Sequence, residues 1–154
     1  MDAFLGLADG TVAYYQNDGS FTARGGTLNP LNGVDVGYFS FPSFSDVDGD
    51  GKVDALIGEV FGKVQYYRNE NGQLIEQSGN TSFDRVDVGF YAAPSLADVD
   101  GDGDVDAAIG GDISLRGDNR GRISFLETIP LVGTASLTEA FPGDEWRGSA
   151  SLTT

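Results

Sequence analysis

The 154-residue chain contains no cysteine and no histidine, and only 9 of its residues are lysine or arginine. Without cysteine it can form neither disulfides nor thiolate metal sites. Without histidine it lacks the commonest general base and a frequent transition-metal ligand. Against 24 acidic residues the few bases leave a net charge of −15 and form no basic patch. This argues against nucleic acid and anionic membranes as partners.

Long apolar runs are also missing, so we expect no membrane insertion. Met1 leads directly into a strand-like segment, which predicts no signal peptide in this chain. What the chain has in quantity is glycine, with 23 residues, and aromatics, with 10 Phe and 6 Tyr. Frequent glycines between short apolar segments indicate tight turns between short strands, so the composition favours an all-β domain.

Two nine-residue segments, 46–54 and 98–106, hold nine of the 24 acidic residues. Carboxylates crowded into one turn repel one another unless a hard cation lies among them, and Ca²⁺ takes about six to eight oxygen ligands. Glycines at positions 4 and 6 of each segment allow the positive φ that wraps a backbone around an ion. The predicted ligands are the carboxylates at positions 1, 3, 5 and 9 and the backbone carbonyl at position 7. In the first loop these are Asp46, Asp48, Asp50, Lys52 (through its C=O) and Asp54; in the second they are Asp98, Asp100, Asp102, Asp104 (through its C=O) and Asp106.

Two other interpretations of these loops are possible, an EF-hand and an acidic turn without a metal. An EF-hand opens in the same way but ends with a bidentate glutamate at position 12, where this chain has Ile57 and Ile109. The flanking segments are also strand-like rather than helical. The other alternative, an acidic turn without a metal, is disfavoured by two copies with identical spacing. We therefore expect two Ca²⁺ sites per chain.

The chain repeats itself with an offset of 52 residues. This offset carries Asp46 onto Asp98, Tyr14 onto Tyr66, and Asp2 onto Asp54. Within one unit the pattern predicts strands near 40–46, 54–59, 63–69 and 73–77. The predicted units are 1–39, 40–91 and 92–148, and residues 149–154 resemble a first strand that completes the first blade of a neighbouring subunit. Repeats of about 40–50 residues built from strands are typical of β-propellers.

The loop Asp-x-Asp-x-Asp-Gly-x-x-Asp, followed by Gly-x-Val-x-Tyr-Tyr, resembles the FG-GAP (VCBS-like) repeats of integrin α-subunit propellers and of many bacterial secreted proteins. The likeness extends over about residues 1–126. It implies a β-propeller of four-stranded blades with a Ca²⁺ loop in each blade, and an extracellular or cell-surface location. Three blades' worth of sequence cannot close a ring of about four to eight blades. We therefore expect a homodimer that forms a six-bladed ring.

Seven residues are inserted between the second and third strands of the third unit, and they contain Arg116, Gly117 and Asp118. An Arg-Gly-Asp loop resembles the tripeptide that integrins recognise. Extended loops on rigid scaffolds often carry binding function, so integrin-type receptors are candidate partners. An incidental polar loop is the alternative.

Three functions were compared: a calcium-binding interaction or adhesion module, a lectin-like propeller that binds glycans, and a propeller-based lyase or dehydratase. No nucleophile–base pair or paired-carboxylate signature is present, so we expect no enzymatic activity. The paired tyrosines of the repeat are expected to pack between blades, with a sugar-stacking platform as the alternative; they are Tyr14, Tyr15, Tyr66 and Tyr67. Glu59, after the second strand of its unit, is expected to be solvated.

Overall fold

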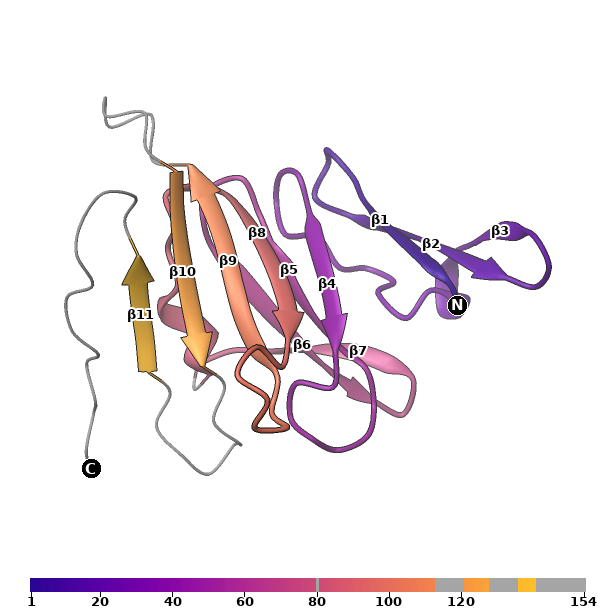
Figure 1. The fold of residues 1–154 in the computed structure, drawn as a ribbon. Helices are drawn as coiled ribbons and strands as arrows, with labels where there is room; N and C mark the ends of the chain where they lie inside the picture. Colours follow the sequence, from indigo (N-terminus) through magenta and orange to yellow (C-terminus); the bar gives the residue numbers. More distant parts are fainter. Residues whose placement is uncertain (80, 113–120, 128–135, 141–154) are drawn as a thin grey trace.

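The computed structural model describes residues 1–79, 81–112, 121–127 and 136–140 of the chain (Figure 1). These residues form short strands, all paired antiparallel, and two 3-10 helices of three and four residues, η1 (Gly26–Leu28) and η2 (Ser82–Arg85). The predicted all-β class is thus confirmed. Among the described residues no helix is long and apolar enough to cross a bilayer.

Three antiparallel sheets follow one another along the chain. The first contains β1 (Ala3–Gly6), β2 (Val12–Asn17) and β3 (Phe21–Arg24). The second contains β4 (Phe41–Ser45), β5 (Asp54–Gly58), β6 (Val64–Glu70) and β7 (Gln73–Gln77). The third contains β8 (Phe90–Ala97), β9 (Asp106–Asp112), β10 (Gly121–Glu127) and β11 (Ser136–Ala140). In each sheet, neighbouring strands follow the order of the chain, so each sheet is a meander.

The strands of the second sheet agree with the sequence prediction to within one residue at nearly every end. The third sheet goes further than the sequence pattern, which fades after residue 126. Its fourth strand, β11, pairs antiparallel with β10, with Leu126 opposite Leu137. The unit boundaries 1–39, 40–91 and 92–148 stay predictions.

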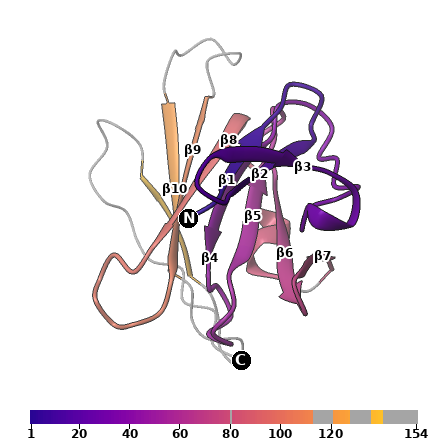
Figure 2. The same cartoon turned by 90° about the vertical axis from the view of Figure 1, so that its right-hand side faces the viewer.

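Two hydrophobic cores lie between the three sheets, and β5 contributes side chains to both cores. Alternate side chains of a strand point to opposite faces, so Ala55 and Ile57 enter the core against the first sheet while Leu56 enters the core against the third. All three are fully buried. The sheets therefore pack face to face, with β1 beside β4 and β4 beside β8 (Figures 1 and 2).

Contacts between neighbouring sheets recur with the 52-residue offset. The amide of Val36 donates to the carbonyl of Gly10 as Val88 donates to Gly62, and Ser40 donates to Leu7 as Ala92 donates to Glu59. At the equivalent positions Gly6 and Gly58, a Cβ atom would overlap the backbone carbonyl of the next unit, at Ser40 and Ala92 respectively. These two glycines are therefore required for the close approach of the sheets.

Two side-chain predictions can be compared with this packing. Tyr14, Tyr66 and Tyr67 are buried, as expected for packing between sheets, while Tyr15 is half-buried. The expectation that Glu59 is solvated was wrong, since its side chain is buried. Its carboxylate accepts hydrogen bonds from the amides of Phe61 (2.7 Å) and Lys63 (2.9 Å), so it caps the turn between β5 and β6.

Candidate metal sites

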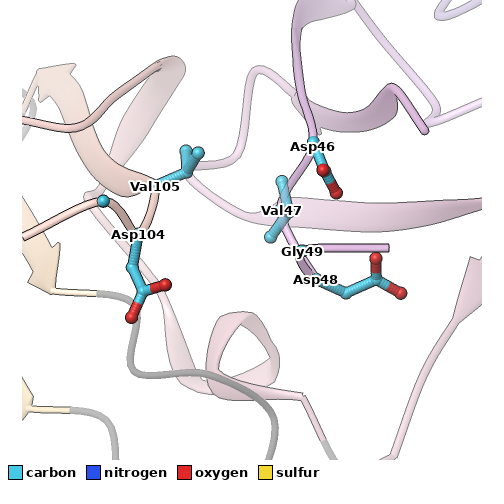
Figure 3. A pocket seen from close by; sticks show the side chains of 7 residues that line it. Asp46, Val47, Asp48, Gly49, Asp104 and Val105 are labelled. Carbon is cyan, nitrogen blue, oxygen red and sulfur yellow. The ribbon is translucent and has the colours of Figure 1, made fainter. Parts of the chain in front are cut away.

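Both acidic loops lie at the same end of the sheets. The first loop (residues 46–53) connects β4 to β5 and the second (residues 98–105) connects β8 to β9, and they neighbour each other at the lower end of Figure 1. Residues of both loops line one cavity of about 210 Å³, with Asp46, Val47 and Asp48 on one side and Asp104 and Val105 on the other (Figure 3). The two loops, which are 52 residues apart in the sequence, thus lie close together in space.

The two loops share most of their internal hydrogen bonds, although only the second has one from the amide of Gly101 to Asp98 (2.7 Å). The amide of the second residue donates to the last aspartate: Val47 to Asp54 (3.1 Å) and Val99 to Asp106 (2.9 Å). The sixth residue donates to the first aspartate: Gly51 to Asp46 (2.8 Å) and Gly103 to Asp98 (3.1 Å). The amides of residues 50, 52, 102 and 104 each donate to the aspartate two residues earlier. The carboxylates are therefore positioned by the backbone of their own loop.

The glycines at positions 4 and 6 have the positive φ that the sequence predicts. The φ angles are 72° and 84° at Gly49 and Gly51, and 83° and 97° at Gly101 and Gly103. Residues with a Cβ atom rarely adopt this region. The same tight path is thus built twice from the same residue types.

Each loop brings three carboxylate oxygens within 4.8 Å of one another, close enough for one ion: those of Asp46, Asp48 and Asp50 in the first loop and of Asp98, Asp100 and Asp106 in the second. In the first loop, Oδ1 of Asp46 is buried without a hydrogen-bond partner, while the buried Oδ2 of Asp48 has an ion pair with Arg68 but no hydrogen bond. A buried carboxylate oxygen without a donor is unfavourable unless a cation satisfies it. The oxygen donors and their spacing therefore fit Ca²⁺.

Asp54 and Asp102 lie outside these two groups, and the carbonyl ligands at Lys52 and Asp104 stay predictions. Asp54 is fully buried and already accepts three hydrogen bonds. They come from the amide of Val47, the amide of Asn69 (2.8 Å) and the hydroxyl of Tyr66 (2.9 Å). Burial and this last bond raise the pKa of the Tyr66 hydroxyl. Asp54 thus links the first loop to β6 through hydrogen bonds.

Asp2 repeats these contacts at the start of the first sheet. The hydroxyl of Tyr14 donates to its carboxylate at 2.6 Å, and the amide of Asn17 donates at 3.0 Å. The hydrogen bond from Tyr14 holds the pKa of Asp2 below its usual value. The sequence match of Asp2 with Asp54 is therefore also a structural equivalence.

Two cations lie at the first loop, and neither was predicted as a counter-ion, because Lys52 was expected only as a ligand through its carbonyl. Arg68, on β6, forms ion pairs with Asp48 through Nε and with Asp50 through Nη2 (3.2 Å). The ammonium group of Lys52 lies 2.7 Å from Asp50 and lowers the pKa of that carboxyl. One sequence signal for Arg68 was a difference between the units. The equivalent residue of the first unit, 52 positions earlier, is the uncharged Gln16.

The second loop differs in its counter-ions. Asp104 takes the place of Lys52, and the register of β9 and β10 gives residue 127, a glutamate, the place of Arg68. In the part of the chain that the structure describes, no lysine or arginine forms an ion pair with the second loop. Asp98, Asp100 and Asp102 are exposed, while Asp106 is buried.

The predicted Arg116-Gly117-Asp118 site and the terminal segment 149–154 lie outside the described residues. Their roles stay predictions.

Comparison with known proteins agrees with the repeat inferred above. Residues 46–109 match the family model described as an FG-GAP-like repeat. No curated protein and no solved structure gives a significant match. The matched segment begins at the first aspartate of the first loop and extends into β9, so it includes both acidic loops. The central part of the chain, residues 46–109, is thus similar to an FG-GAP-like repeat.

Proposed function

We propose that the chain is part of a calcium-stabilised β-propeller that serves as a non-enzymatic protein-interaction module outside the cell. The observation that carries this proposal is the convergence of three carboxylate oxygens in each of two loops with the same backbone path. Both loops fall within the segment that matches the FG-GAP-like repeat. Absence of histidine and cysteine from the sequence supports a binding rather than a catalytic role.

Calcium in these loops would have a structural role. Asp46, Asp48 and Asp50 would hold one ion and Asp98, Asp100 and Asp106 the other, with carbonyl oxygens completing each shell. A bound ion supplies positive charge that neutralises the carboxylates and joins the end of one strand to the beginning of the next. Binding to the folded state alone stabilises that state by mass action.

Calorimetric titration with Ca²⁺ tests the metal sites. We expect two ions per chain for the natural sequence and one for each of the variants Asp48→Asn and Asp100→Asn. Asp18→Asn is the control, because Asp18 lies outside the loops in an exposed ion pair with Arg24. If the chain binds no Ca²⁺ at about 1 mM, where extracellular sites are filled, the calcium part of the proposal is wrong.

Receptor binding through Arg116-Gly117-Asp118 is the second part of the proposal. It is supported by the place of the tripeptide in an insertion between β9 and β10, which pair with each other up to Asp112 and Gly121. We expect cells bearing integrin-type receptors to attach to the immobilised chain and Asp118→Glu to abolish attachment. Attachment that persists in this variant would exclude the tripeptide as the binding element.

Assembly is the third part. In the second and third sheets a strand pairs with β5 and with β9 on the side away from β6 and β10, whereas the described residues place no strand on that side of β1. We propose that residues 149–154 of a second copy pair there and that two chains form a six-bladed ring. Light scattering should then give twice the 16.2 kDa mass of one chain. A monomer would contradict this arrangement.

A further inference from the structure

The two acidic loops share one backbone path but neutralise their carboxylates differently. In the first loop the third and fifth aspartates, Asp48 and Asp50, both face the guanidinium group of Arg68. The side chain of Asp48 is only 1% exposed and that of Asp50 is 20% exposed. The charge of these two predicted ligands is therefore compensated by a side chain that reaches them from the neighbouring strand.

Arg68 is held beside both carboxylates by ion pairs, and its Nη2 also donates a hydrogen bond to Oδ2 of Asp50 (3.2 Å). Its Nε and the Oδ2 of Asp48 form an ion pair, yet both atoms lack a directed hydrogen bond. The side chain of Arg68 is 41% exposed and can turn toward solvent. A side-chain cation at this place neutralises the carboxylates, and it can move away when an ion binds to them.

The second loop carries five aspartates, and none of the lysines and arginines whose side chains the structure describes forms an ion pair with it. Position 7 of the loop is Asp104 instead of Lys52, and a glutamate stands at residue 127, in register with Arg68. Calcium affinity depends on the charge of the site, and the second loop has one more aspartate and one fewer lysine than the first. A bound ion should therefore stabilise the second loop more than the first.

We propose that Arg68, assisted by Lys52, is an internal counter-ion that takes the place of calcium in the first loop, so that the second loop binds Ca²⁺ more tightly. This inference rests on the proposed calcium function. Arg68 stabilises the first loop when it is empty and competes with Ca²⁺ for Asp48 and Asp50. Removing Arg68 should therefore lower the stability of the chain without calcium and raise the calcium affinity of the first loop.

The test is calorimetry with Ca²⁺ in a chain whose second site is removed by Asp100→Asn, so that only the first loop reports. Adding Arg68→Gln should raise the affinity of the first loop roughly fivefold, the size expected of a partly exposed ion pair. The same change should lower the melting temperature in EDTA. Arg24→Gln is the matched control, because Arg24 pairs with Asp18 on the surface, away from both loops, and should change neither quantity.

A reciprocal variant makes the test independent of the first loop. Asp104→Lys, in a chain with Asp48→Asn, gives the second loop the lysine of the first and should weaken its calcium binding. Unchanged or weaker binding after Arg68→Gln, or equal affinities of the two loops in the natural chain, would overturn the inference while leaving the calcium sites in place. Absence of any calcium binding would overturn both.

Discussion

The loops 46–54 and 98–106 share most of their backbone hydrogen bonds and have the same left-handed glycines, but different surroundings. In the first loop the protein supplies the hydroxyl of Tyr66, the guanidinium of Arg68 and the ammonium of Lys52. In the second, an aspartate stands at the place of Lys52, and residues 125 and 127 are phenylalanine and glutamate. The shape of such a loop is thus set by local backbone chemistry, while the balance of its charge depends on side chains of the loop and of the neighbouring strand.

Removing calcium should have the largest effect and should separate the two loops. Each filled site contributes about 2.7 kcal/mol when free Ca²⁺ is a hundred times its Kd, so EDTA should lower the melting temperature. Hydrogen exchange should show that residues 98–106 lose protection more than residues 46–54, because the first loop keeps its own cations. Equal melting curves with EDTA and with millimolar Ca²⁺ would contradict a structural role for the ion.

The variant Tyr66→Phe should make the first loop resemble the second. It removes the hydroxyl that donates to the buried carboxylate of Asp54 (2.9 Å) and keeps the ring in the core. Oδ2 of Asp54 keeps the hydrogen bond from the amide of Val47, so we expect the loss of one hydrogen bond to a charged group, about 1.5–3 kcal/mol. Chemical denaturation in EDTA measures this loss. Tyr38→Phe is the control, because that side chain is 59% exposed; an equal loss in the control would mean that the bond to Asp54 is not the cause.

The glycines test what the two loops have in common. Gly51→Ala and Gly103→Ala place a Cβ atom at φ values of 84° and 97°. We expect each to destabilise the chain by about 1–2 kcal/mol, and by similar amounts in both loops. Gly25→Ala is the control, since Gly25 has a φ of −126° and open space around its Cβ position. Denaturation curves that differ strongly between the two loop variants would show that the shared backbone path is not equally important.

A smaller effect should appear in the pH dependence of the first loop. The hydrogen bond from Lys52 lowers the pKa of Asp50 in the folded chain. The contribution of the Asp50 carboxylate to stability is therefore present above the pKa of aspartate in the unfolded chain. It is lost as the pH falls through the lower pKa of the folded chain. Carboxyl NMR titration without calcium should show that the pKa of Asp50 rises in Lys52→Gln. An unchanged pKa would mean that the contact is not maintained in solution.

Much of this arrangement could be predicted from local sequence patterns. Alternating apolar residues and Asn-Gly or Gly turns located β4 to β7, and the spacing of aspartate and glycine located both loops with the correct backbone conformation. These features depend on residues close together in the chain, so a short window contains the information. The offset of 52 then extended the prediction to the neighbouring sheets.

Contacts set by strand register could not be predicted in the same way. Arg68 reaches Asp50 across 18 residues, and it does so because β6 pairs with β5 in one particular register. Glu59 is buried because its turn folds onto its own backbone amides, which composition does not indicate. β11 lies where the repeat pattern has faded, so its pairing with β10 had no sequence signal.

The inequality of the two loops is tested most directly by following backbone amide NMR signals during a Ca²⁺ titration. The amides of Gly51 and Gly103 both donate to the first aspartate of their loop, so each reports on ion binding in its own site. We expect the signal of Gly103 to reach its final position at a lower Ca²⁺ concentration than that of Gly51. Simultaneous saturation of the two signals, or saturation of Gly51 first, would contradict it.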